Sequence, residues 1–322
     1  MRQLGFACLV STVLALPAWA EAPRVITDIP ITQGLVADVM GERGDVTSLL
    51  DAGADPHTAQ LRPSRMQALA EADVVIWIGA GLTPWLDDVL HATAHDTPTL
   101  ELLTDGGVEV LGAAEQAETS GHDHSHDHDH GHAEEQTDTH DDGHDHAHAG
   151  DPHGWLDPDI AVSWLYAIGA ALADADPEGA DHYRANARAA AARYEALHQD
   201  LTGDLAAVGG REIVVFHDAY SHFARAFGVT VAGSIALGDA ADPGARRLAE
   251  LRHLVEDRDV ACVFREPQHS PAAAEALADD AGIGIGTLDP LGVDQAPGAG
   301  HYEAMMRALA ASILDCVTDA SG

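Results

Sequence analysis

The sequence contains no lysine, so every one of its 16 Lys+Arg residues is an arginine. Against these stand 53 Asp and Glu residues, which leaves a formal net charge of −37 over 322 residues. A charge this negative repels phosphate backbones, which argues against nucleic-acid binding. It suits cations or a basic partner surface. The hydrophobic content of 46% is nevertheless high enough for a folded core.

Long hydrophobic runs are also scarce. An apolar run over residues 4–16 follows Arg2, and Ala-Trp-Ala at residues 18–20 has the form of a signal-peptidase site. The run is too short to span a membrane comfortably, and no later stretch approaches that length. These features predict a signal peptide over residues 1–20, cleaved near Ala20/Glu21, and a soluble exported protein. The alternative is an uncleaved membrane anchor.

Cysteine is rare, with three residues in the whole chain. Cys8 falls in the predicted signal peptide, so Cys262 and Cys316 remain in the mature protein. In an oxidising compartment two cysteines pair by default, although two buried free thiols are the alternative.

Several common functional motifs are absent. The sequence holds no HExxH, no GxxxxGK[ST] and no CxxC. It therefore lacks the signatures of helical zinc proteases, P-loop nucleotide binding and dithiol redox chemistry.

One segment, residues 121–150, is rich in histidine and acid, with ten His and nine Asp or Glu. It has almost no apolar residues, so we expect a solvated, disordered loop within an insertion over residues 113–150. We interpret its histidines as weak accessory metal ligands that raise the local metal concentration and pass ions onward. A hydrated insertion with incidental metal affinity is the alternative. The histidines are His122, His124, His126, His128, His130, His132, His140, His144, His146 and His148.

The rest of the chain alternates apolar, β-branched runs with helical patterns. Such alternation predicts parallel sheets covered by helices on both faces. Four strands precede the middle of the chain and four follow it, which predicts an α/β fold of two similar lobes. The expected strands cover residues 24–30, 45–50, 73–79, 97–102, 212–216, 229–235, 260–264 and 284–288.

A long helical pattern separates the two sets of strands, over residues 176–208. Its apolar residues repeat at steps of four and three, which predicts one buried stripe of Tyr183, Ala187, Ala190, Tyr194, Leu197, Leu201 and Leu205. Asp176 is the expected N-cap and Pro177 suits the first helical position, while Gly209 and Gly210 would end the helix. At 1.5 Å per residue, about 30 residues span roughly 45 Å, so we expect a rigid connector along both lobes. The predicted division is an N-terminal lobe over residues 21–158, a helix at 159–175 that packs on it, the linking helix, and a C-terminal lobe over 209–322.

Three histidines outside the histidine-rich loop have distinctive settings. His57 ends the sequence GADPH after a predicted strand, His153 lies in DPHGWLDP, and His217 follows the strand-like VVF. In open α/β sheets, ligands bind beyond the carboxyl ends of strands, and Asp289 occupies such a position in the second lobe. Each residue alone is also compatible with an ordinary loop histidine or turn aspartate.

Taken together, the sequence blocks around these residues resemble the ZnuA-type periplasmic zinc-binding proteins, the solute-binding components of high-affinity zinc ABC importers. The resemblance runs through nearly all of the mature chain. The blocks are residues 53–64 (GADPHTAQLRPS), 72–79 (ADVVIWIG), 151–158 (DPHGWLDP), 215–220 (VFHDAY), 243–252 (PGARRLAELR), 262–268 (CVFREPQ) and 286–292 (GTLDPLG).

The resemblance implies a Zn²⁺ site in the cleft, with His57, His153 and His217 as ligands and either Asp289 or a water in the fourth position. Three neutral imidazoles and one carboxylate suit tetrahedral Zn²⁺. The choice of zinc over manganese depends on His217, because the manganese branch tends to have a carboxylate there. The resemblance also implies a Cys262–Cys316 disulfide.

Two further histidines depart from the family pattern. His222 and His269 stand where we expected aromatic or other residues. Either is a candidate accessory ligand near the cleft, but a surface role is the favoured interpretation for both.

The expected function is therefore capture of Zn²⁺ in the periplasm and delivery to an ABC permease, without enzymatic activity. The implied partner is the permease, with periplasmic zinc chaperones as further candidates, and a monomer is the expected state. One alternative is a periplasmic zinc buffer or chaperone without a permease. Another is a secreted zinc hydrolase with water on the metal and Asp218 as the nearest base.

Overall fold

The computed structural model describes residues 22–94, 96–107, 150–236 and 243–319. The predicted signal peptide and the ten histidines of the histidine-rich loop lie outside these residues. Within the described ranges, no helix combines the length and apolar character that a membrane span requires.

Two four-stranded parallel sheets form the framework, as predicted. The first contains β1 (Val25–Thr27), β2 (Val46–Ser48), β3 (Val74–Trp77) and β4 (Thr99–Glu101). The second contains β5 (Glu212–Val215), β6 (Thr230–Ser234), β7 (Val260–Arg265) and β8 (Gly284–Thr287). The strand orders, β2-β1-β3-β4 and β6-β5-β7-β8, are equivalent, so the two sheets repeat one topology. All eight predicted strands are confirmed.

Helices alternate with the strands. Those of the first half are α1 (Pro30–Met40), η1 (Gly41–Arg43), α2 (Pro63–Ala70), α3 (Pro84–Thr93), α4 (Leu102–Asp105), η2 (Gly154–Leu156) and α6 (Pro158–Ala175). Then follow α7 (Ala180–Leu205), η3 (Ala206–Val208), α8 (Ser221–Phe227), α9 (Ala245–Asp257), α10 (Ala272–Ala281) and α11 (His301–Asp319). Four of the α-helices begin with proline, whose missing N–H costs nothing at the first helical position.

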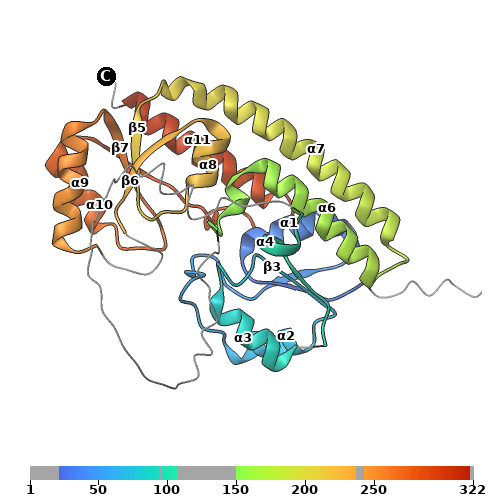
Figure 1. Ribbon diagram of the computed structural model, residues 1–322. Coiled ribbons are helices and arrows are strands. Elements are labelled where there is room, and N and C mark those ends of the chain that lie inside the picture. The colour runs from blue at the N-terminus through green and yellow to red at the C-terminus, as the bar shows by residue number, and fades with distance from the viewer. Residues whose placement is uncertain (1–21, 95, 108–149, 237–242, 320–322) are drawn as a thin grey trace, which may run out of the picture.

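Each sheet has an outer face with its own small core. Val75 and Trp77 of the first sheet pack with α2 and α3, and Val214 and Val263 of the second pack with α9 and α10. In Figure 1, α9 and α10 lie at the left edge of the molecule and α2 and α3 at its bottom.

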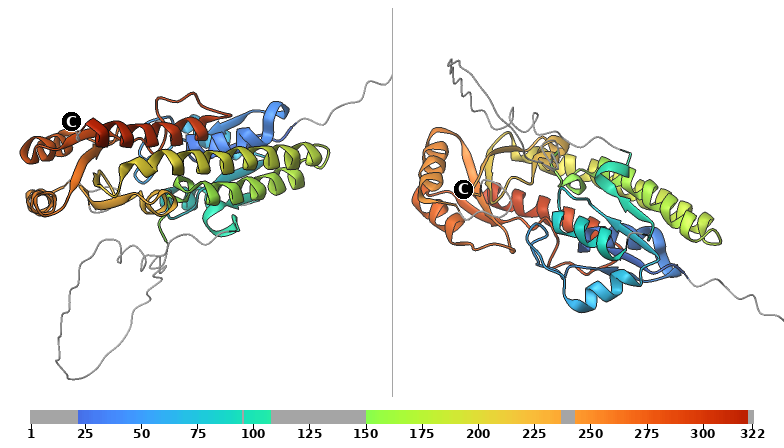
Figure 2. Two further views of the ribbon diagram at one scale, coloured as in Figure 1. Left: turned by 90° about the horizontal axis from the view of Figure 1, so that it is seen from above. Right: turned by 60° about the horizontal axis from the view of Figure 1, so that its bottom comes forward.

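The inner faces of both sheets share a single core. Val74 and Ile76 of β3 belong to the same buried cluster as Ile213 and Val215 of β5, together with residues of α1, α6, α7 and α11. Three of these helices, α6, α7 and α11, lie side by side across the molecule (Figure 2). The lobes are therefore joined by a continuous hydrophobic interior as well as by the linking helix.

The linking helix α7 buries the stripe that the sequence predicted. Its buried residues are Tyr183, Ala187, Ala190, Ala191, Tyr194, Leu197, Leu201 and Leu205. On α7, Arg193 forms ion pairs with Asp38 of α1 (2.8 Å) and Glu303 of α11 (2.7 Å). Three separate segments of the chain are thereby fastened together.

The predicted start of this helix at Asp176 was wrong, because α7 begins at Ala180. Asp176 ends α6 instead, and its carboxylate accepts hydrogen bonds from Arg43 (2.6 Å), Tyr183 Oη (2.8 Å) and the Gly179 N–H (3.2 Å). These bonds hold residues 176–179 as a turn between α6 and α7, so the carboxylate is not a helix N-cap.

A disulfide joins Cys262 of β7 to Cys316 of α11. The implied bridge is therefore present, and the alternative of two free thiols is wrong. It fastens the last helix to the centre of the second sheet.

Candidate metal centre

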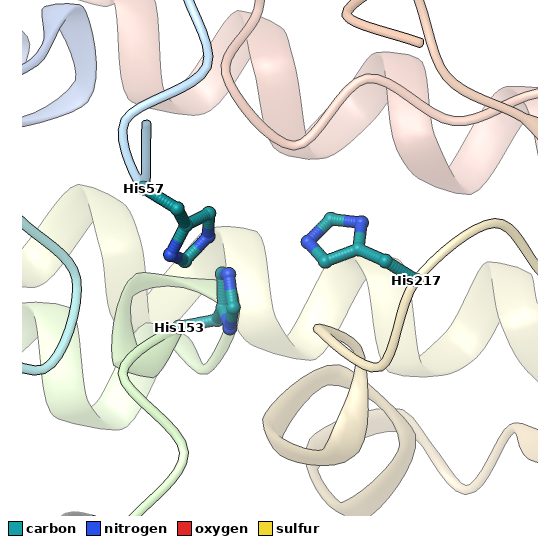
Figure 3. A group of neighbouring side chains, drawn as sticks. All are labelled: His57, His153 and His217. Carbon is teal, nitrogen blue, oxygen red and sulfur yellow. The ribbon is translucent and has the colours of Figure 1, made fainter. Parts of the chain in front are cut away.

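Three of the predicted ligands converge at the boundary between the lobes. His57, His153 and His217 each offer a ring nitrogen, and these atoms all lie within 4.8 Å of one another. The ring centroids are 5.4 Å apart for His57–His153, 5.2 Å for His153–His217 and 6.2 Å for His57–His217. The rings come from three loops and point toward one another (Figure 3).

His57 lies in the loop that follows β2. Its backbone N–H donates to Asp55 Oδ1 (2.9 Å), and the indole N–H of Trp85 donates to the Pro56 carbonyl (2.7 Å). The loop turns at Gly53, whose φ of +84° lies in the left-handed region that glycine adopts readily. A side-chain clamp from α3 thus positions the least buried of the three imidazoles.

His153 is buried and its ring is oriented by a carboxylate two residues earlier. His153 Nδ1 lies 2.8 Å from Asp151 Oδ1, which also accepts the His153 backbone N–H (3.0 Å). Burial opposes ionisation of Asp151, but the hydrogen bonds from the His153 ring and backbone help to outweigh it and hold the pKa of Asp151 below its usual value. Asp151 is therefore a carboxylate and accepts the ring N–H.

The segment that carries His153 is bound to the second lobe. The Trp155 indole N–H donates to the Pro290 carbonyl (2.9 Å), and Arg225 of α8 pairs with Asp157 (2.9 Å). The position of His153 therefore depends on contacts with the C-terminal half of the chain.

His217 follows β5 and is oriented by Glu266, which directly follows the neighbouring strand β7. His217 Nδ1 lies 2.7 Å from Glu266 Oε2 and 2.9 Å from Oε1. The Tyr220 hydroxyl donates to the same carboxylate (3.1 Å), and burial next to Glu266 raises the pKa of Tyr220 well above its ordinary value. The hydroxyl thus stays protonated as a donor.

The two carboxylates determine which ring nitrogen carries the hydrogen. A carboxylate oxygen accepts, so the hydrogen of each imidazole is assigned to Nδ1 in His153 and His217. The lone pair is then on Nε2, as in the carboxylate–histidine–metal arrangements of metalloproteins. Sequence reasoning missed both carboxylates as functional residues, although each lies in a block that carried the resemblance.

The structure does not bring Asp289 into the histidine group. Its Oδ1 accepts hydrogen bonds from Gln268 (3.0 Å) and from the N–H groups of Leu291 and Gly292 (3.1 Å each), and its Oδ2 accepts one from the Val293 N–H (2.5 Å). The carboxylate therefore organises the loop after β8, where four donors already satisfy it.

The surface role favoured for His222 was wrong. The side chain is fully buried, and its Nε2 lies 3.1 Å from the Asp151 carbonyl oxygen. Burial lowers the pKa of His222, so the neutral ring donates to that carbonyl and supports the His153 segment. His269 is also not a free surface residue, since it is stacked on Phe216 at 4.4 Å and lines the same pocket as the three histidines.

The pocket around the site favours a cation. It encloses about 300 Å³, including space open to solvent, and its described lining contains Asp55 and Glu266 but no arginine. Nothing positively charged within that lining opposes a metal ion at the three imidazoles.

The sequence model of one protein family, ZnuA (zinc-uptake complex component A periplasmic), matches residues 25–316. The chain belongs to the ZnuA family. It is 41% identical over 307 residues to the high-affinity zinc uptake system protein ZnuA of Paracoccus denitrificans (strain Pd 1222), and the match covers 94% of each chain. It is 30% identical to the protein of the same name from Brucella suis biovar 1 (strain 1330), over 92% of each chain.

Solved ZnuA structures have the same fold. A crystal structure of ZnuA superposes with a TM-score of 0.73 at 26% identity, covering 91% of this chain and 98% of the other. A ZnuA deletion mutant lacking residues 138–173 in its own numbering, solved with zinc bound, gives a TM-score of 0.71 at 27% identity, covering 92% and 98%. The family resemblance inferred from the sequence is confirmed.

Proposed function

We propose that this chain captures Zn²⁺ in the periplasm and delivers it to the membrane permease of an ABC importer. The observation that carries the proposal is the convergence of three imidazoles, two of them fixed by buried carboxylates so that Nε2 is available. Membership of a family described as a periplasmic zinc-uptake component supports it. The names of its relatives, high-affinity zinc uptake proteins, agree.

The donor set suits zinc. Three neutral imidazoles are borderline-soft ligands that bind Zn²⁺ at about 2.0–2.1 Å, whereas Mn²⁺ prefers oxygen-rich sites. Asp289 is held by its own loop, so we propose that a water or other small ligand completes the tetrahedron. A site with three protein ligands holds the ion firmly but leaves one position from which a partner can withdraw it.

Fixed tautomers favour capture. Neither His153 nor His217 has to rotate or exchange its ring hydrogen when the ion arrives, which reduces the cost of ordering the site. Because imidazole ligates only in its neutral form and ordinarily titrates at about pH 6.5, acidification promotes release.

Uptake measurements separate import from simple zinc buffering. The test uses cells that lack their own zinc-binding component and grow at limiting zinc, with and without the permease genes. We expect the wild-type chain to restore ⁶⁵Zn uptake only with the permease, and His57→Ala/His153→Ala to fail in both strains. Restored growth without the permease would support the buffer and overturn the import proposal.

A further inference from the structure

A second set of potential ligands adjoins the three histidines. His217, Glu266 and His269 also offer one donor atom each, all within 4.8 Å of one another. Among the described residues, these are the two groups of histidine, cysteine or carboxylate side chains that converge this closely. They share His217 and line one pocket.

Among the described residues, the side chain of His269 is held in place by stacking and has no hydrogen-bond partner. Its ring lies parallel to Phe216, with centroids 4.4 Å apart and 10° between the planes. Its Nε2 is 3.8 Å from Glu266 Oε2, too long for a hydrogen bond, and its side chain is 21% exposed. The neutral ring therefore faces the pocket with one nitrogen lone pair that a metal ion can use.

Glu266 contributes a negative charge that is almost fully buried. The carboxylate is 1% exposed and accepts hydrogen bonds from His217 and Tyr220. Neither partner carries the fixed positive charge of an arginine. A carboxylate has about four acceptor positions, so these two bonds leave room for a cation. A buried charge without a fixed positive partner is itself stabilised by a nearby cation.

We infer that His217, Glu266 and His269 form a second, outer position for a divalent metal ion of the zinc type. The inference rests on the proposed zinc-capture function. Glu266 lies beside His217 Nδ1, so an ion at the outer position takes Nδ1 and the ring hydrogen moves to Nε2, the nitrogen that an ion at the inner position takes. Because a neutral imidazole has one lone-pair nitrogen, His217 serves one ion at a time. The inner and outer positions are thus alternatives for one ion, and His269 supplies a further ligand in the same pocket.

The experiment removes the inner position and asks whether zinc remains at the outer one. The mature full-length chain carries His57→Ala/His153→Ala, and zinc affinity is measured by competition with a chromogenic chelator. In this background His269→Phe removes the ligand while keeping an aromatic ring against Phe216. The matched control is His253→Phe, which removes an exposed histidine paired with Glu256 three residues away on α9.

We expect the double variant to keep one His269-dependent ion. Losing a residue that hydrogen-bonds to a metal ligand lowers metal affinity by roughly 10–100-fold. His269→Phe removes a ligand itself and should lower the affinity at least as much, whereas His253→Phe should leave it unchanged. Zinc-soaked crystals of the double variant should show anomalous density between His217, Glu266 and His269. Any zinc bound by the histidine-rich loop is common to all variants and cancels in the comparison.

Equal affinity with and without His269 would overturn the inference, and so would an absence of anomalous density at the outer position. The proposed function fails in a different way. In that case wild type and the His57→Ala/His153→Ala variant would bind zinc equally tightly, whatever residue is present at position 269.

Discussion

His217 donates its Nδ1 hydrogen to Glu266, whose oxygens lie 2.7 and 2.9 Å away and whose side chain is 1% exposed. The two residues follow β5 and β7, neighbouring strands of the second sheet, so the sheet itself fixes their separation. Asp151 does the same for His153 from within one loop. The site is thus prearranged by a layer of carboxylates behind the imidazoles.

Replacing Glu266 with glutamine tests this arrangement. The amide retains the shape but removes the charge that raises the basicity of His217. We expect zinc affinity to fall by roughly 10–100-fold, with one tight ion still bound. The measurement is chelator competition, with Glu250→Gln on the exposed face of α9 as the matched control. Unchanged zinc affinity would show that the charge of Glu266 does not strengthen zinc binding by His217.

Asp289 should matter for stability more than for zinc. Its two carboxylate oxygens accept hydrogen bonds from three backbone N–H groups and so hold residues 289–293. An asparagine amide has one acceptor oxygen and cannot replace both. We expect Asp289→Asn to lower the free energy of unfolding by about 1–3 kcal/mol. Zinc affinity should fall much less than in His153→Ala. A loss of affinity as large as that of His153→Ala would identify Asp289 as a ligand.

The contact of His198 with two acceptors predicts a pH-dependent contribution to stability. Its Nδ1 lies 3.0 Å from Asp159 Oδ1 on α6, and its Nε2 lies 3.3 Å from the Ala226 carbonyl on α8. Only the doubly protonated ring donates to both. Burial opposes this charged form, but the bonds to Asp159 and Ala226 outweigh burial and raise the pKa of His198.

A raised folded pKa means that the stabilisation is complete below the unfolded value of about 6.5 and is lost as pH rises through the folded value. In metal-free protein, His198→Ala should therefore destabilise more at about pH 5.5 than at about pH 8.5. Urea unfolding at the two pH values measures this. Asp159→Asn should remove most of the pH dependence that His198 adds to the free energy of unfolding. If His198→Ala destabilised the protein equally at both pH values, His198 would not be the group responsible.

The shared core predicts little relative motion of the lobes. Buried residues of both sheets and of α1, α6, α7 and α11 form one cluster, so hinge opening would expose apolar surface. Scattering curves of metal-free and zinc-loaded protein should give the same radius of gyration within error. A clear decrease in the radius of gyration on zinc binding would show that the lobes move relative to one another.

The framework of the fold was predictable from the sequence because parallel strands buried on both faces appear as continuous apolar runs. All eight runs correspond to strands, and the stripe on α7 is buried as expected. The start of α7 was not predictable, because the Asp176 carboxylate accepts hydrogen bonds from Arg43 and Tyr183. Arg43 is distant in sequence, and Tyr183 lies within α7 itself. Propensity rules do not anticipate such tertiary bonds.

The settings after strands and in the DPHGWLDP loop made the three histidines candidates, and the family resemblance singled them out as ligands. Glu266 was missed, although a signal existed, since it lies two residues after the predicted strand 260–264 and on the same sheet edge as His217. The burial of His222 had no such signal, because it depends on how α8 packs against the Asp151 segment. Side-chain partners across elements become visible only in three dimensions.

We propose that His57, His153 and His217 together hold one zinc ion. Chelator competition on the mature wild-type chain and His217→Ala tests it most directly, with His253→Ala as the control for loss of an exposed histidine. We expect one tight ion in wild type and in the control, and its loss in His217→Ala. If His217→Ala kept the tight ion, the three histidines would not be its ligands.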